Sequence, residues 1–143
     1  MNAFLHWAES NISLNQVASA TLTALRVTRL DFQVGELYPV QGLVDGYNAD
    51  DIIELRACRG EINLPAAYTR ETDMELSPFN AAFTSVDTDG SFRFEGLEQG
   101  VYSILLVVRP QSANTEQEFL AGTRWSSAVI TVPAANDIVL RMP

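Results

Sequence analysis

The chain has 143 residues, of which 47% are hydrophobic, and this fits one globular domain with a buried core rather than a disordered chain. Its formal net charge is −9, and all nine of its basic residues are arginines. A strongly acidic surface repels phosphate backbones, so we expect no nucleic-acid partner. The absence of lysine excludes a Schiff base and a phosphate-binding P-loop lysine, and the single cysteine excludes an internal disulfide.

The first 35 residues differ in pattern from the rest and are assigned to a separate N-terminal arm. Their apolar positions fit a short helix or an extended arm, followed by a strand from about residue 20. The start MNAFLHWAES lacks a basic region, so it does not resemble a signal peptide. No apolar run approaches the ~18 residues that a transmembrane helix needs, so no membrane span is expected. We expect three apolar residues of the arm to dock on this domain or on a neighbouring subunit: Phe4, Leu5 and Trp7.

Short apolar or alternating runs, separated by turn residues, make up residues 36–143. Strands are expected in Leu37–Gly46, Asp51–Cys58, Phe79–Val86, Ser91–Glu95 and Val101–Val108, and in the later segments EFLAGTRW, SAVITV and DIVLRM. Many short strands with regular turn signals are typical of all-β folds. We therefore predict a second region, residues 36–143, that forms an antiparallel β-sandwich of about seven strands.

The segment VDTDGSFRFEGLEQGVYSILLVV holds the clearest structural signal. Asp89-Gly90 lies between two alternating runs, and this predicts a hairpin because glycine adopts positive φ without strain. Phe92 and Phe94 then share one face of a strand, and Tyr102 begins a second apolar row that shares one face. Packing between these rows predicts the core of the sandwich.

The same segment resembles the signature of carboxypeptidase-regulatory-like domains, which are prealbumin-like sandwiches. The matching pattern is Asp-Gly-x-Phe-x-Phe, then Gly-Leu, then Gly-x-Tyr before an apolar strand; VQGLVDG and DIIEL are similar to the first two strands, and ITVPAANDIVLRMP to the closing ones. The resemblance covers roughly residues 38–143 and departs from the family at Arg59–Pro78 and Pro110–Glu118. It implies a Greek-key, prealbumin-like or Ig-like fold and a role as a spacer, adhesion module or assembly part.

Residue counts argue against an enzyme. A catalytic zinc site of the carboxypeptidase type needs histidine and glutamate ligands, and the chain has one histidine, His6, outside the predicted sandwich. No nucleophile-elbow motif accompanies that histidine. We therefore expect no catalytic residues and no resident cofactor.

Five carboxylates are expected at one end of the sandwich, because successive loops of an antiparallel sandwich alternate between its ends. This end would gather Tyr47 and the acidic residues Asp45, Asp50, Asp51, Asp87 and Asp89. Such a cluster suits calcium or an acidic recognition face. A hairpin turn alone also accounts for Asp and Gly at positions 87–90.

Two other features bear on partners. The loop Arg59–Pro78 exceeds the usual length of loops in compact domains, and its Tyr68 and Met74 would either pack back on the domain or contact a partner. Trp125 would be a core residue or, with Tyr47, a platform for a glycan.

Two functions from different classes follow from these features. The first is a structural subunit of an extracellular or virion particle, bound to protein neighbours, identical or different, through its arm and long loops. The alternative is an adhesion module that binds carbohydrate or calcium.

Overall fold

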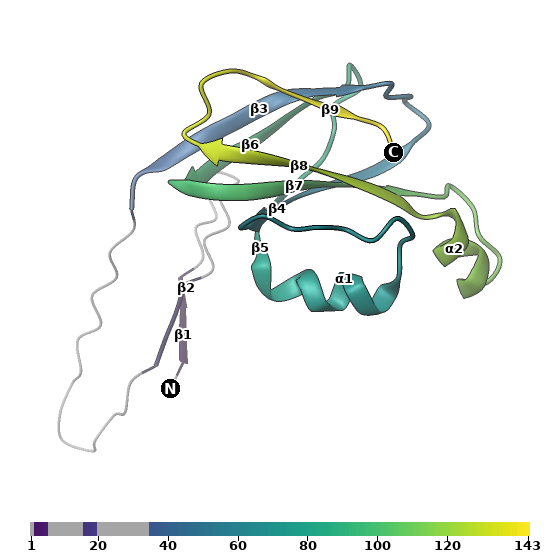
Figure 1. Cartoon of the computed structure of the whole chain (residues 1–143), viewed down its shortest axis with the longest axis horizontal. Helices are drawn as coiled ribbons and strands as arrows, with labels where there is room; N and C mark the ends of the chain where they lie inside the picture. The colour runs from purple at the N-terminus through teal and green to yellow at the C-terminus, as the bar shows by residue number, and fades with distance from the viewer. Residues whose placement is uncertain (1, 6–15, 20–34) are drawn as a thin grey trace.

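In the computed structural model of the chain, the described residues are 2–5, 16–19 and 35–143. Residues 35–143 form two sheets that pack face to face (Figure 1). The three-stranded sheet has the order β6 (Ser91–Glu98), β3 (Leu37–Asp45), β9 (Ile138–Arg141). The four-stranded sheet has the order β5 (Asn80–Thr84), β4 (Ile52–Arg59), β7 (Gly100–Arg109), β8 (Arg124–Val132). The predicted all-β sandwich of about seven strands is confirmed at this level.

The core between the sheets consists of the two rows that the sequence predicts. Phe92 and Phe94 of β6 are 3% and 2% exposed, and Tyr102 and Ile104 of β7 are 1% and 0% exposed. The two phenylalanine rings meet edge to face, with centroids 6.1 Å apart. Val40, Leu55, Leu106 and Leu140, from four other positions in the two sheets, belong to the same cluster. The predicted core is therefore confirmed.

The closing strand runs in the direction opposite to the one expected. β9 pairs with β3 in parallel, from Gly42 opposite Ile138 to Asp45 opposite Arg141, whereas every other strand pair of the described residues is antiparallel. β9 does not return beside β8 but crosses to the other sheet. Glycine is required at position 42, because a Cβ there would lie 2.0 Å from the backbone oxygen of Ile138. The prediction of a fully antiparallel sandwich is corrected at this pair.

The predicted turn at Asp89-Gly90 is present, but the strands before and after it, β5 and β6, belong to different sheets. Gly90 has φ +85° and its N–H donates to the carbonyl of Asp87 at 2.9 Å. Val86 and Phe92 form an isolated bridge beyond this turn. β5 and β6 nevertheless lie in different sheets, so the turn is a corner of the sandwich rather than the end of an extended hairpin.

Two short helices were not predicted from the sequence: one lies where a loop was expected and the other where a strand was expected. α1 (Arg70–Leu76) and a 3₁₀ turn (Ser77–Phe79) lie within the long loop, and α2 (Glu116–Gly122) occupies most of EFLAGTRW. The strand prediction for EFLAGTRW is therefore wrong before Arg124, where β8 begins. Thr115 explains the helix: its side chain accepts from the N–H of Glu118, while the Glu118 carboxylate accepts from the N–H of Asn114.

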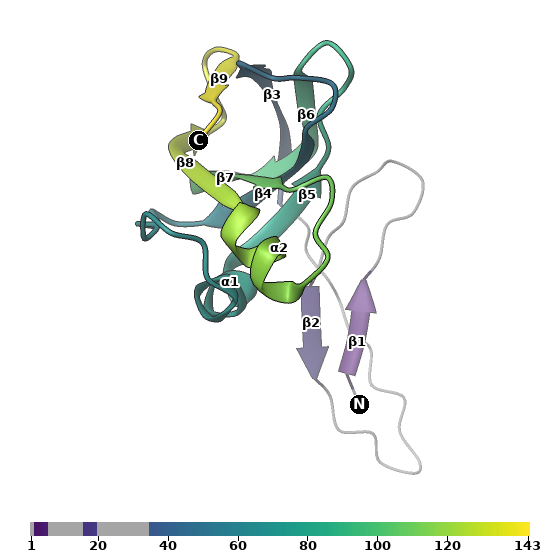
Figure 2. The same cartoon turned by 90° about the vertical axis from the view of Figure 1, so that its right-hand side faces the viewer.

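The N-terminal strands form a sheet of their own. β1 (Asn2–Leu5) pairs antiparallel with β2 (Gln16–Ser19), and neither joins the two sheets of the sandwich (Figures 1 and 2). Residues 2–5 are thus extended rather than helical. The strand expected from about residue 20 lies outside the described residues.

Replacing Phe94 by alanine should lower the free energy of unfolding by about 3–5 kcal/mol, because the cavity left between two sheets cannot collapse. Phe83→Ala is the matched control: its ring is 58% exposed, so the loss should be about 1 kcal/mol or less. Chemical denaturation measures both. Equal losses in the two variants would show that Phe94 is not a core residue.

Candidate functional site

The loop end of the sandwich brings together three segments that are distant in sequence. The 45–51 loop lies against the 87–90 turn, because a Cβ at Gly90 would be 3.5 Å from side-chain atoms of Tyr47. Just before the loop, the N–H of Val44 donates to the carbonyl of Gly90 at 2.8 Å. On its other side the Gln111 amide donates to the carbonyl of Asp50. The predicted gathering of these loops at one end is confirmed.

A hollow of about 360 Å³ lies at this end, between the β3–β4 loop, the 87–90 turn and β9. Its half-buried aromatic residue is Tyr47, and Asp45 and Asp89 are its acidic residues. The remaining lining residues are Leu43, Val44, Gly46, Ala49, Thr88 and Val139. One aromatic ring, two carboxylates and two exposed aliphatic side chains, of Leu43 and Val139, therefore surround this hollow.

Three carboxylates at this end, including Asp89, form hydrogen bonds within the turns. Asp51 accepts from the N–H of Asn48 at 3.1 Å, and Asp89 accepts from both the N–H and the hydroxyl of Ser91. Those bonds from Ser91 lower the pKa of Asp89. Asp87 contacts the same hydroxyl at 3.5 Å. Among residues 2–5, 16–19 and 35–143, no three His, Cys, Asp or Glu side chains are grouped so that they could hold a metal ion. Calcium binding therefore stays a prediction, and no group of acidic side chains among the described residues supports it.

The long loop packs on the outer face of the four-stranded sheet (Figures 1 and 2). Ser103 of β7 fixes its start, because the hydroxyl donates to the carbonyl of Gly60 and accepts from the N–H of Ile62, both at 2.9 Å. The cluster that forms beneath the loop contains Cys58, Leu76, Leu105, Val107 and Trp125, with Ile62, Leu64 and Tyr68 packed against it. The expectation that the loop folds back on its own domain therefore holds for Tyr68.

Trp125 belongs to this covered surface. It is 6% exposed, its indole N–H donates to the carbonyl of Pro65 at 2.8 Å, and its ring meets that of Tyr68 edge to face at 4.9 Å. A second hollow, of about 550 Å³, lies beside it between the loop, α2 and the C-terminus. So little of the indole is exposed that it does not present a face on which a sugar could stack.

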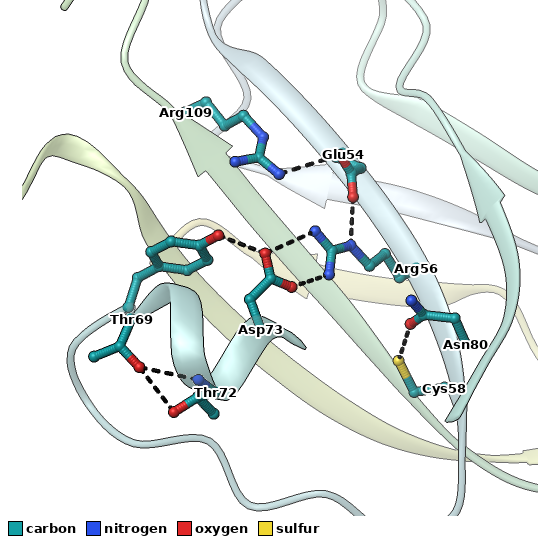
Figure 3. Close-up of polar contacts among 9 residues, drawn as sticks. Glu54, Arg56, Cys58, Thr69, Thr72, Asp73, Asn80 and Arg109 are labelled. Carbon is teal, nitrogen blue, oxygen red and sulfur yellow. Dashed lines mark hydrogen bonds and ion pairs between the residues drawn. The ribbon is translucent and has the colours of Figure 1, made fainter. Parts of the chain in front are cut away.

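A polar network under α1 holds the loop in place (Figure 3). Arg56 of β4 lies beneath the helix with its side chain 7% exposed and forms ion pairs with Asp73 of α1 and with Glu54. The Tyr68 hydroxyl also donates to Asp73, and Arg109 reaches Glu54 at 3.4 Å. Arg56 and Asp73 were not among the site residues predicted from the sequence. The available signal that this face of the sheet is covered was the segment Val101–Val108, which is apolar on both faces.

The ionisation of this network fits a structural role. Burial opposes the charge on Arg56, but hydrogen bonds to Asp73 and Glu54 outweigh that cost and raise its pKa. Burial likewise raises the pKa of Asp73, yet hydrogen bonds from Arg56 and Tyr68 more than compensate and lower it. Burial raises the pKa of Cys58 to about 11, and its thiol donates to the Asn80 side chain, so it is a poor nucleophile. Near neutral pH, Arg56 and Asp73 are therefore charged and the Cys58 thiol is neutral, which fits an ion pair that holds α1 on the sheet.

The residues expected to meet partners have different surroundings. Met74 is 70% exposed on α1. The ring of Tyr68 packs against Trp125, and its hydroxyl donates to Asp73. Phe4 and Leu5 lie in β1, and Trp7 lies outside the described residues. No helix in the described part of the chain is long and apolar enough to cross a membrane.

No protein-family model, no curated protein and no solved structure matches the chain.

Replacing Asp73 by asparagine should lower the free energy of unfolding by about 2–3 kcal/mol at neutral pH, because the buried guanidinium of Arg56 then keeps only Glu54 as an ion-pair partner. Glu75→Gln, an exposed change of the same kind in the same helix, should have almost no effect.

The effect of Asp73 should depend on pH in a defined direction. Its pKa is lower in the folded state, so its stabilising contribution is fully present above the ordinary aspartate pKa of about 4 and is lost as the pH falls through the lower folded value. Denaturation of wild type and Asp73→Asn should therefore converge below that pH. A difference that persists unchanged into acid would rule out the ion pair as its cause.

Proposed function

We propose that this protein is a non-enzymatic structural subunit of a larger extracellular or virion assembly, joined to its neighbours through the N-terminal segment. The observation that carries this proposal is the β1–β2 hairpin, which pairs with neither sheet of the sandwich. An isolated two-stranded hairpin is at best marginally stable in water and gains stability by packing or pairing with another surface. A neighbouring subunit provides such a surface.

The surroundings of the ionisable groups support a role in binding rather than catalysis. Arg56, Asp73, Glu54 and Arg109 are engaged with one another under α1 and serve to fasten the loop. The sequence contains one histidine, which is too few for a zinc site with several histidine ligands, and no nucleophile-elbow motif accompanies it for a triad. We therefore propose that no reaction takes place on this domain.

A prealbumin-like, Greek-key sandwich of the carboxypeptidase-regulatory-like kind is the fold family we propose. It is supported by the Asp-Gly-x-Phe-x-Phe pattern, whose two phenylalanines fill the core between the sheets. Members of this family act as spacers, adhesion modules or assembly parts, which agrees with a subunit role and a place on a cell or virion surface.

Breaking the hairpin should abolish self-association of the full-length chain. Phe4 and Val17 face each other in the β1–β2 pairing, and proline at both positions removes two N–H donors and is tolerated poorly in paired strands. We expect wild type to elute as an oligomer and Phe4→Pro/Val17→Pro as a monomer in size-exclusion chromatography with light scattering.

The matched control places two prolines in the exposed loop before α2. Ser112→Pro/Ala113→Pro should remain oligomeric, since both residues are exposed and belong to no helix or strand. An unchanged melting temperature would show that each variant keeps its sandwich. A monomeric wild type, or an oligomer that survives the loss of the hairpin, would contradict the proposal.

A second candidate function rests on the hollow at the loop end. Tyr47 with Asp45 and Asp89 provides a ring for a sugar face and acceptors for its hydroxyls. This arrangement favours carbohydrate as the ligand of an adhesion module. It requires no contribution from Trp125, which is buried.

Glycan-array binding tests this candidate. Tyr47→Ala should abolish binding to any glycan that wild type captures, because the hollow then loses its aromatic ring. Tyr38→Ala is the control, since Tyr38 is also half-buried but does not line the hollow. Failure of the wild-type protein to bind any glycan, or binding that persists in Tyr47→Ala, would exclude the site.

A further inference from the structure

We infer that the hairpin of one copy docks on the free edge of β8 in a second copy and extends its four-stranded sheet. This inference rests on the proposed function, because it names the surface that receives the N-terminal arm. Pairing of a peptide segment with an exposed sheet edge is a common mode of recognition, in which main-chain hydrogen bonds supply the affinity.

The edges of the sandwich differ in how they are protected. The β5 edge lies against β6, since the Thr84 hydroxyl donates to the carbonyl of Arg93 at 2.8 Å and Val86 bridges Phe92. β6 carries Arg93 and Glu95 along its exposed face, and these form an ion pair at 3.2 Å. β9 has only four residues and ends in Arg141. Charged side chains, short length and a covering neighbour are the usual means by which edges avoid pairing.

β8 has none of this protection over most of its length. It has nine residues, and among the described residues it pairs on one side only, with β7. The C-terminal residues cover its start, because the Ser126 hydroxyl donates to the carbonyl of Arg141 at 3.2 Å and Arg124 donates to the carbonyl of Pro143 at 3.0 Å. The open part, Ser127–Val132, has the sequence SAVITV and contains no charge and no proline.

The side chains along this open part suit a strand partner. Ser127, Val129 and Thr131 are exposed on the outer face, with Val129 50% exposed. Val101 of β7, 46% exposed, pairs with Thr131 in the neighbouring strand. Exposed β-branched residues on an uncharged edge strand are the features of a sheet that can be extended.

The occupant that the chain itself provides is the hairpin of another copy. β1 and β2 each have four residues, NAFL and QVAS, and neither contains a charge. Copies of a chain with a net charge of −9 repel one another, so contact between them is least opposed where both segments are uncharged. The hairpin and the open part of β8 meet that condition.

Charged substitutions on β8 test this docking in the full-length chain. Ser127→Lys/Val129→Lys places two lysines on exposed positions of the edge, and should convert the wild-type oligomer to a monomer without a change in melting temperature. Leu43→Lys/Val139→Lys adds the same charge at exposed positions of the three-stranded sheet, away from β8, and should stay oligomeric. Light scattering after size exclusion gives the mass of each.

Mixing two defective variants then identifies which surfaces meet. Phe4→Pro/Val17→Pro keeps the β8 edge, and Ser127→Lys/Val129→Lys keeps the hairpin, so the two monomers should form a one-to-one complex in which a single docked hairpin remains. Neither variant should self-associate. The mass of the mixed peak reports this result directly.

The outcomes separate failure of this inference from failure of the proposed function. If the β8 variant stays oligomeric while the hairpin variant is monomeric, the arm docks elsewhere and only this inference is overturned. If the hairpin variant stays oligomeric while the β8 variant is monomeric, copies associate through β8 alone and both proposals fail. A wild-type monomer also overturns both.

Discussion

The burial of β7 on both of its faces is the constraint on which the rest of the structure depends. Residues Tyr102 to Val108 are all buried, although a sandwich covers only one face of each sheet. Ile104 and Leu106 face the three-stranded sheet, whereas Leu105 and Val107 face outward and need a second cover. The long loop with α1 supplies that cover, so the unusual length of the loop follows from the apolar character of this strand.

The cover is held by a buried ion pair as well as by apolar contacts. Charges taken out of water are costly unless they are paired and hydrogen-bonded, and Arg56 meets this condition through Asp73 and Glu54. The Phe83 ring lies 5.9 Å from the same guanidinium. An apolar loop could slide over the outer face of the sheet, whereas the Arg56–Asp73 pair fixes α1 at one position. The polar groups beneath α1 therefore determine where the helix sits.

Local patterns in the sequence predict local features of the fold. Alternation places Phe92 and Phe94 in the core, and Asp89-Gly90 gives the turn, because both depend only on nearby residues. EFLAGTRW was misassigned although Thr115 and Glu118 form a helix capping signal, because its aromatic and apolar residues also suit a strand. The parallel course of β9 and the pairing of Arg56 with Asp73 could not be predicted, since both depend on contacts between segments that meet only after the sheets have packed.

The distribution of charge decides what kind of contact this surface can make. Several of the charged side chains in the described part of the chain are used within the domain: in turns at the loop end, under α1, and as ion pairs on β6. A copy of the same acidic chain meets repulsion across most of the remaining surface. The open part of β8, Ser127–Val132, carries no charge and, among the described residues, pairs on one side only, so it escapes this repulsion. In the assembly that we propose, association between copies would therefore depend on main-chain pairing, with side chains mainly preventing pairing at the wrong edges.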